Sequence, residues 1–193
     1  MEWTWKMIEI CDKEIKKLPA PNQIYGEWKS YLLILQWFFN ARNISNPVIV
    51  EVGTQAGRQK AHYEAFFDAV HIGIDHSEKY SKPDILGNSH DPETLIKLKE
   101  RLGAREVNVV FIDADHEYEA VKNDYEMYGP LARDLVAFHD ISGVKSVKKL
   151  WAEIREQEKG NQDLEFLSIG DLHMGWCELG IGIIKKQQNR WRS

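Results

Sequence analysis

Short β-branched runs alternate with amphipathic helical patterns along most of this chain, and that alternation restricts its fold more than any other feature. The runs that we predict as strands are residues 47–52, 70–75, 84–86, 107–113 and 134–140. The helical patterns occupy residues 27–42, 56–69, 91–103, 117–131 and 143–160. Strands that alternate with helices pair in parallel, and the helices cover both faces of the sheet. The sequence therefore predicts an α/β protein with a doubly wound, mostly parallel sheet.

The C-terminal part of the chain breaks this alternation. Residues 164–169 and 177–186 both have strand patterns, and the turn-rich stretch 170–175 separates them. Two strands joined by a short turn pair as an antiparallel hairpin. We therefore predict a C-terminal hairpin that adds an antiparallel edge and completes a seven-stranded sheet.

Length and charge limit the organisation of the chain and the partners it can have. At 193 residues, with 43% hydrophobic content, the chain is long enough for one ordinary core and too short for two comfortable domains. We expect a single domain, 1–193, with an N-terminal helical cap in residues 1–45 and the core fold in residues 46–193. A net charge of −5 offers no basic stripe for a phosphate backbone, so a nucleic-acid partner is not favoured.

The cysteines and the apolar stretches bear on the location of the protein. Cys11 and Cys177 stand alone, without C-x-x-C spacing, so neither a zinc knuckle nor a disulfide framework is predicted. The first residues lack a secretory leader pattern, and the apolar stretch 31–39 is too short to span a bilayer. We expect a cytoplasmic protein without a membrane partner. Aromatic residues near the N-terminus fit an acceptor pocket, plain packing or a homodimer equally well, and these are Trp3, Trp5, Tyr25 and Trp28.

Polar residues gather where the predicted strands end. The chain reads EVGTQAG at the end of the first strand, Asp75 ends the second, GNSHD follows the third, DADH ends the fourth and HD ends the fifth. Each has an ordinary explanation as turn chemistry or helix capping. Parallel strands, however, bring their carboxyl ends to one edge of the sheet, and ligands of such folds bind there. The sequence therefore predicts a functional site at that edge.

The ends of the first two strands carry candidate binding residues. Gly53 and Gly57 permit close approach of the backbone to a ligand, although their G-x-x-x-G spacing differs from the dinucleotide fingerprint. Glu51 lies in a buried strand, so its carboxylate needs a cation or a donor, from a ligand or from the chain's own Lys or Arg. Asp75 stands where an acid binds ribose hydroxyls in doubly wound folds, with a turn cap as the alternative.

Five segments, in this order and at these separations, carry a family resemblance: VIVEVGTQAG, IGID, LGNSHDPETL, VFIDADHEYEAVKNDYEMYGPL and VAFHD. Together they resemble the class I S-adenosylmethionine-dependent methyltransferases, and most closely the cephalosporin-hydroxylase-type and macrocin-type O-methyltransferases, over residues 45–158. The most specific piece is D-x-D-H-x-Y-x-x-V-x-x-D, which begins at Asp113 and ends at Asp124. The resemblance implies a Rossmann-like sheet and S-adenosyl-L-methionine as the cofactor.

The resemblance also implies roles for individual residues. The cofactor-binding residues that it indicates are Glu51, Gly53, Thr54, Gly57, Asp75, Asn88, Ser89 and Asp113. The first four would shape the pocket for the methionine half, Asp75 would bind the ribose, and Asn88 with Ser89 would lie near the adenine. Asp113 would face the sulfonium and the substrate. The chain departs from the family at Arg58 and Gln59, where a small residue and a hydroxyl are usual, and at Asn88, where Asp is common.

The acids and imidazoles after the fourth and fifth strands allow two kinds of chemistry. Asp113 and Asp140, with His139 beside them, offer ligands for Mg²⁺, which prefers oxygen and keeps several waters. Alternatively, His139 acts as a general base, because an ordinary imidazole pKa of about 6.5 suits removal of a hydroxyl proton. His116 is a further catalytic candidate, or it orients Asp113. A zinc-protease motif fails because Ala120 stands where the second histidine would be needed.

The function that the sequence favours is O-methylation of a hydroxyl on a small molecule or sugar, with S-adenosyl-L-methionine as the donor and Mg²⁺ as a candidate second cofactor. Two alternatives stay open. A metal-dependent hydrolase would use Asp113, Asp115, His116, His139 and Asp140 to bind metal and activate water. A catalytically inactive partner subunit that still binds the cofactor would account for the departures from the family.

Overall fold

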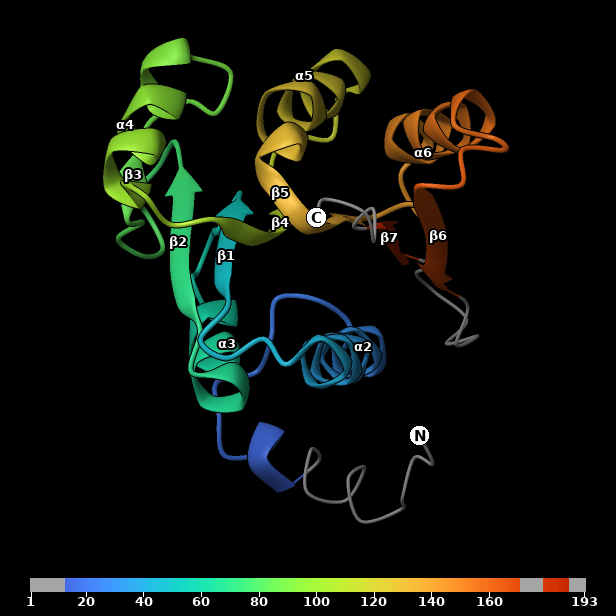
Figure 1. Ribbon diagram of the computed structural model, residues 1–193. Coiled ribbons are helices and arrows are strands. Elements are labelled where there is room, and N and C mark those ends of the chain that lie inside the picture. Colours follow the sequence, from blue (N-terminus) through green and yellow to red (C-terminus); the bar gives the residue numbers. More distant parts are fainter. Residues whose placement is uncertain (1–12, 171–178, 188–193) are drawn as a thin grey trace.

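The computed structural model describes residues 13–170 and 179–187, which form one seven-stranded sheet between two layers of helices (Figure 1). The strands are β1 (Val48–Val52), β2 (Val70–Asp75), β3 (Ile85–Leu86), β4 (Val107–Ile112), β5 (Ala132–His139), β6 (Leu164–Ile169) and β7 (Ile181–Lys186). Their order across the sheet is β3-β2-β1-β4-β5-β7-β6. Neighbours from β3 to β5 pair in parallel, whereas β7 is antiparallel to both β5 and β6. The predicted sheet with its antiparallel C-terminal edge is confirmed.

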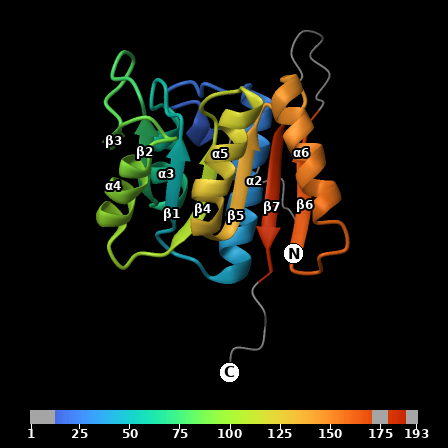
Figure 2. The ribbon, with the colours of Figure 1, turned by 90° about the horizontal axis from the view of Figure 1, so that it is seen from above.

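The helices lie on both faces of the sheet. They are α2 (Tyr25–Arg42), α3 (Gln59–Phe67), α4 (Pro92–Leu102), α5 (Tyr118–Tyr128), the 3₁₀ turn η1 (Gly129–Leu131) and α6 (Lys145–Gln157). α4, α5 and α6 cover one face, and α2 and α3 cover the other (Figures 1 and 2). Within the part of the chain that the structure describes, no helix is long and apolar enough to cross a membrane.

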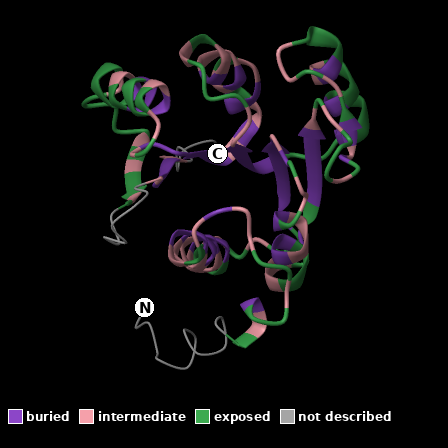
Figure 3. Ribbon diagram, turned by 180° about the vertical axis from the view of Figure 1, so that it is seen from behind, coloured by how far each residue is buried: buried purple, intermediate pink, exposed green. Residues whose placement is uncertain are grey.

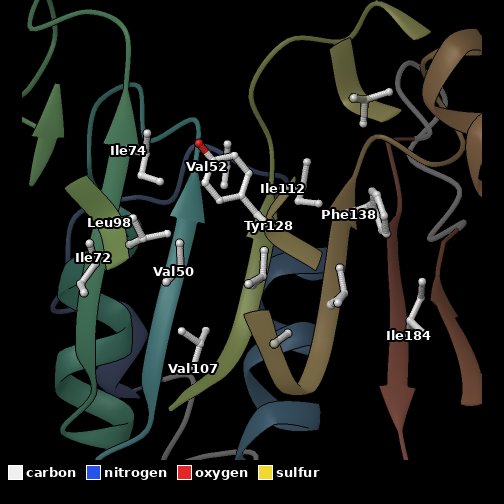
Figure 4. Packing of buried hydrophobic residues seen from close by; sticks show 14 of the residues in the cluster. Val50, Val52, Ile72, Ile74, Leu98, Val107, Ile112, Tyr128, Phe138 and Ile184 are labelled. Carbon is white, nitrogen blue, oxygen red and sulfur yellow. The ribbon is translucent and has the colours of Figure 1, made fainter. Parts of the chain in front are cut away.

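Each face of the sheet has its own hydrophobic core, because successive side chains of a strand point to opposite faces. On β1, Val50 and Val52 belong to the core under α4, α5 and α6 (Figure 4), while Ile49 belongs to the core under α2 and α3. A parallel sheet buried on both faces requires apolar residues at nearly every strand position. All five residues of β1 are buried accordingly, and Figure 3 shows the central strands buried along their length.

α2 confirms the helix predicted near the N-terminus and shows what its aromatic residues do. Trp28, Leu32, Leu35, Phe38 and Phe39 are all buried, as the periodicity predicts. They pack on the sheet face beside α3, where the Trp28 ring meets Phe111 edge-on with centroids 5.9 Å apart. Packing therefore accounts for Trp28, one of the aromatic residues considered for an acceptor pocket or a dimer; Trp3 and Trp5 lie outside the described residues.

Several predicted boundaries move by a few residues. β5 begins at Ala132 and not at residue 134, and the helix predicted over 117–131 ends as an α-helix at Tyr128. A 3₁₀ turn follows because Pro130 has no backbone N–H to continue the α-helical bonds. α4 begins at Pro92, one residue after the start of the pattern over 91–103, and the side chain of Asp91, its N-cap residue, makes no capping hydrogen bond. β7 begins at Ile181, and residues 177 and 178 of the predicted strand lie outside the described residues.

Candidate active site

A cavity of about 1080 Å³ opens at the carboxyl ends of the parallel strands. It lies around the switch point of the sheet, where the strand order reverses. There β1 pairs with β2 on one side and with β4 on the other. The predicted site residues that line it are Gly53, Asp75, Asn88, Ser89, Asp113, Asp115, His116, His139 and Asp140. Glu51, Thr54 and Gly57 are not part of its lining. The edge of the sheet named by the sequence thus holds a cavity large enough for a nucleoside-sized ligand and a second small molecule.

The loop after β1 lies very close to the loop after β4. Gly53 has a φ of +89°, and a Cβ built on it would lie 2.3 Å from the carbonyl oxygen of Asp113. Gly57 has a φ of +63° and faces the Ser81 hydroxyl, which would lie 3.0 Å from its Cβ. Thr54 is buried against Gly73 instead of facing the cavity. Glycine at 53 is thus required both by the backbone conformation and by the neighbouring chain.

Asp75, at the end of β2, presents a fixed carboxylate to the cavity. Its Oδ2 accepts a hydrogen bond from the Gln55 N–H at 2.8 Å, and its Oδ1 accepts one from the Ser77 N–H at 2.9 Å. Its side chain is only 10% exposed. A carboxylate oxygen can accept more than one hydrogen bond, so both oxygens keep capacity for ligand hydroxyls. The turn-cap alternative and the ribose-binding prediction are therefore compatible.

Glu51 meets a partner that the sequence reasoning did not assign to it. Its side chain is fully buried, and Oε2 lies 2.7 Å from Nε2 of His71 on β2. Burial raises the pKa of Glu51, and the contact with His71 opposes that rise. Of the two partners considered for Glu51, the chain's own basic group is the one present, although it is an imidazole and neither Lys nor Arg.

Two acids and two histidines form a closed cluster at the ends of β4 and β5. His139 Nδ1 lies 3.3 Å from Asp113 Oδ1 and 3.3 Å from Asp140 Oδ2. His116 Nε2 lies 2.9 Å from the same Asp140 oxygen and 3.6 Å from Asp113 Oδ1. The left-handed backbone of Asp140, with φ of +63°, turns its carboxylate back toward this group. One oxygen from each acid is thus shared by both imidazoles.

In this cluster the carboxylates and the imidazoles stabilise each other's charged forms. Burial would lower the pKa of His139, but its contacts with Asp113 and Asp140 outweigh burial and raise that pKa to about 11. The same two acids raise the pKa of His116 to about 10. Both imidazoles are therefore protonated at neutral pH in this arrangement. The ordinary pKa that favoured His139 as a general base does not hold here, so His139 could accept a substrate proton only after losing its own.

The donor set fits a divalent cation. Asp113, His139 and Asp140 each offer one ligand atom, and these atoms all lie within 4.8 Å of one another. Carboxylate oxygens are the ligands that Mg²⁺ prefers, and a cation bound there would favour loss of the imidazole protons. Asp115 does not belong to this group; its Oδ1 accepts a hydrogen bond from the Glu117 N–H at 2.9 Å. The three residues predicted as metal ligands are thus brought together.

The N-terminal segment and the first turn of α2 supply site residues that sequence reasoning missed. The Gln23 side chain lines the cavity and donates a hydrogen bond to Asp113 Oδ2 at 2.7 Å. Glu27, in the first turn of α2, has Oε2 3.8 Å from His139 Nε2, and its Oε1 accepts the Gly180 N–H at 3.0 Å. Both side chains are almost fully buried. The sequence signal available for Glu27 was an acidic residue within a largely apolar helical pattern, while Gln23 carried no signal.

The loop after β3 forms the far side of the cavity. Asn88 Oδ1 accepts the His90 N–H at 3.0 Å, and the Ser89 carbonyl accepts the Tyr128 hydroxyl at 2.7 Å. His90 also lines the cavity. Its Nε2 lies 3.6 Å from Oδ1 of Asp124 on α5, which is longer than a hydrogen bond.

Asp124 should make folding stability depend on pH. It is fully buried, and burial raises its pKa from 3.8 to about 6. Between these values the folded protein binds more protons than the unfolded chain, so stability falls as the pH rises through that window. Asp124→Asn should remove this pH dependence and stabilise the protein at pH 7 by on the order of 2 kcal/mol. Urea unfolding at pH 4 and pH 7 measures both effects.

The exposed Glu119 on the same helix provides the matched control. Glu119→Gln removes the same kind of charge from α5 without changing a buried group, so its unfolding curves should follow the wild type at both pH values. An Asp124→Asn variant that kept the wild-type loss of stability between pH 4 and pH 6 would contradict the assignment.

Comparisons with known proteins agree with this arrangement at the level of the fold. No protein-family model and no curated protein sequence matches the chain. The O-methyltransferase TomG from Streptomyces achromogenes, solved in complex with SAM, has a TM-score of 0.61 at 12% identity, over 96% of this chain and 92% of its own. An O-methyltransferase from Bacillus cereus, solved in complex with SAH, has a TM-score of 0.60 at 12% identity, over 97% of this chain and 93% of its own.

A third solved structure contains a metal. MycE, a methyltransferase from the mycinamycin biosynthetic pathway solved with Mg, SAH and mycinamycin VI, has a TM-score of 0.58 at 15% identity. The match covers 96% of this chain but only 56% of MycE, so the chain is similar to one part of that protein. The chain therefore has the fold of the class I S-adenosylmethionine-dependent methyltransferases, as its sequence motifs predict.

Proposed function

We propose that this protein is an S-adenosylmethionine-dependent O-methyltransferase that acts on a hydroxyl group of a small molecule. The observation that carries the proposal is one cavity with two chemically different sides. Asp75 presents a carboxylate for a ribose on one side, and the cluster of Asp113, His139 and Asp140 faces the other. S-adenosylmethionine, when bound, supplies an electrophilic methyl group on its sulfonium. The protein's task is then to align the acceptor and to help remove its proton.

The chain's own residues divide this task. The carboxylate of Asp75 is held by two backbone N–H groups and is free to accept ribose hydroxyls. Asn88 and Ser89, further along the same wall, would border the adenine, as the resemblance implies. Glycine at 53 keeps the β1 loop against the β4 loop and leaves space for the ligand. The roles of Glu51, Thr54 and Gly57 are indirect in this proposal, because these residues lie behind the cavity wall.

The acid and imidazole cluster would act on the acceptor. Asp113, Asp140 and His139 would hold a divalent cation, with Mg²⁺ as the first candidate, and the cation would supply electrostatic stabilisation of an acceptor oxygen as it loses its proton. His116 and His139 supply compensating positive charge when the carboxylates have no cation. Support comes from the donor geometry and from MycE, a protein of the same fold that was solved with Mg and a small-molecule ligand.

Neither alternative function explains the site as well. A hydrolase would need Asp115 and His116 as metal ligands and would leave the cavity wall at Asp75 unused, and Asp115 lies outside the three-residue ligand group. The inactive-subunit alternative rested on Arg58, Gln59 and Asn88. Arg58 and Gln59 contact the N-terminal segment, at the Ala20 carbonyl and at Gln23, and so have structural partners. The homodimer, the cytoplasmic location and the single-domain organisation stay predictions from the sequence.

Isothermal titration calorimetry with S-adenosylmethionine and S-adenosylhomocysteine tests the proposal. We expect saturable binding of both, with NAD and ATP as control ligands that bind far more weakly. Methyl transfer is then followed with labelled S-adenosylmethionine and a panel of hydroxylated small molecules and sugars, in the presence and absence of Mg²⁺. Absence of heat and of a thermal shift with either ligand, across several buffers and metals, would rule the proposed function out.

The metal site has a separate test. In Asp113→Asn and Asp140→Asn proteins, Mg²⁺ affinity should fall by at least about 100-fold, because each change removes a charged ligand where even outer-shell changes cost about 10–100-fold. Asp115→Asn is the matched control, an equal loss of charge two residues from Asp113, and it should leave the affinity unchanged. Weaker Mg²⁺ binding by Asp115→Asn would favour the hydrolase alternative instead.

A further inference from the structure

Two buried amide side chains form a line that ends on Asp113. Gln59, the first residue of α3, donates from Nε2 to Oε1 of Gln23 at 2.5 Å. Gln23 in turn donates from Nε2 to Oδ2 of Asp113 at 2.7 Å. Gln59 is 1% exposed and Gln23 is 5% exposed, so water does not compete freely for these bonds. The line connects three segments that are far apart in the sequence: the N-terminal segment, α3 and the end of β4.

The chemistry of the three groups fixes the direction of these hydrogen bonds. An ionised carboxylate only accepts, so Gln23 must turn its NH₂ group toward Asp113. Its carbonyl oxygen then faces Gln59, which must donate in turn. If Gln23 rotated by half a turn about its amide axis, its oxygen would face the carboxylate of Asp113, and two acceptors would meet. By donating to the Gln23 oxygen, Gln59 stabilises Gln23 in the one orientation that serves Asp113.

The two carboxylate oxygens of Asp113 therefore have different partners. Oδ2 is engaged by Gln23, whereas Oδ1 faces His139 Nδ1 at 3.3 Å and His116 Nε2 at 3.6 Å. This is the side on which Asp140 Oδ2 lies, since that oxygen contacts the same two imidazoles. We propose that Gln23 and Gln59 are positioning residues that present Asp113 to a divalent cation through Oδ1 alone. The inference rests on the proposed function, because it takes this cluster to be the cation site.

Other contacts hold the N-terminal segment in place independently of this line. His62 Nε2 lies 2.8 Å from the Pro19 carbonyl oxygen, and the Arg58 guanidinium lies 3.5 Å from the Ala20 carbonyl. Loss of the Gln59 amide should therefore leave the segment docked and remove only the orientation of Gln23. Gln59, one of the residues at which the chain departs from related sequences, thereby acquires a role in the site.

Mn²⁺ titration of the full chain by calorimetry tests the inference. Gln59→Met and Gln23→Met keep the side-chain length and remove the hydrogen bonds. Each should weaken Mn²⁺ binding by about 10-fold or more, the usual effect of losing a group that orients a metal ligand. The double variant should bind Mn²⁺ no more weakly than Gln23→Met, because Gln59 reaches Asp113 only through Gln23. Gln157→Met, which removes an exposed amide from α6, is the matched control and should change nothing.

Two further measurements separate this inference from folding and from the proposed function. The circular dichroism spectrum and the S-adenosylhomocysteine affinity should be the same in Gln59→Met and the wild type, and Gln59→Met alone carries the test if Gln23→Met does not fold. Unchanged Mn²⁺ affinity in Gln59→Met, additive losses in the double variant, or a wild type that binds S-adenosylhomocysteine but no Mn²⁺ would each overturn the inference. A wild type that does not bind S-adenosylhomocysteine would overturn the proposed function instead.

Discussion

Gly53→Ala should be among the most damaging single substitutions in this protein. With φ of +89°, an added Cβ is strained by about 1–2 kcal/mol before any contact is considered. That Cβ would also lie 2.3 Å from the Asp113 carbonyl oxygen and 2.5 Å from Ala114 Cα, which are backbone atoms that no rotamer change can move. The loops after β1 and β4 must separate, so we expect a total loss of on the order of 4 kcal/mol in unfolding free energy and loss of S-adenosylhomocysteine binding.

Gly160→Ala is the control that isolates the close approach from the backbone strain. Gly160 has nearly the same φ, +87°, but a Cβ there meets nothing within 4 Å. It should cost only the strain, about 1–2 kcal/mol, and leave ligand binding intact. Urea unfolding and calorimetry measure both variants. Equal destabilisation by the two substitutions would show that the contact between the β1 and β4 loops is unimportant.

The sheet could be predicted from the sequence because its signals are local. A strand buried on both faces reads as a nearly continuous apolar run, as in β1 and β4. The bounds predicted for β2 and β6, 70–75 and 164–169, match the structure residue for residue. The edge that carries the site follows from topology alone, since parallel strands end together. Asp113, His139 and Asp140 were therefore foreseeable as neighbours, although they come from two strands.

The orientation of individual side chains could not be predicted in the same way. Glu51 lies on β1 beside residues that line the cavity, but strand alternation turns it toward α2 and α3, where it meets His71. The contact of Gln23 with Asp113 spans 90 positions in the sequence and depends on how the N-terminal segment lies across α3. The raised pKa of His139 follows from two carboxylates that only the folded chain brings within reach. Each of these facts arises from tertiary packing and leaves no periodic pattern.

The two sides of the cavity should respond independently to mutation. Asp75 lies on β2, and its bonds run to Gln55 and Ser77. Asp113 instead contacts Gln23 of the N-terminal segment, His139 of β5 and His116. Changes far apart without shared partners are generally additive. A variant on one side should therefore alter binding of the nucleoside or of the cation, but not both. Because of this separation, a substitution on the ribose side is the sharpest single test of the proposed function.

Asp75→Ala should weaken S-adenosylhomocysteine binding by about 100-fold. In the proposed pose the carboxylate accepts hydrogen bonds from ribose hydroxyls, and hydrogen bonds to a charged group contribute roughly 1.5–3 kcal/mol each. The change also releases the Gln55 and Ser77 N–H groups that shape the loops. Glu78→Ala is the matched control, because Glu78 is an exposed acid on the same loop outside the cavity lining. Calorimetry should show wild-type S-adenosylhomocysteine affinity for Glu78→Ala, and Mn²⁺ affinity should be unchanged in both variants. Wild-type S-adenosylhomocysteine affinity in Asp75→Ala would refute the ribose placement.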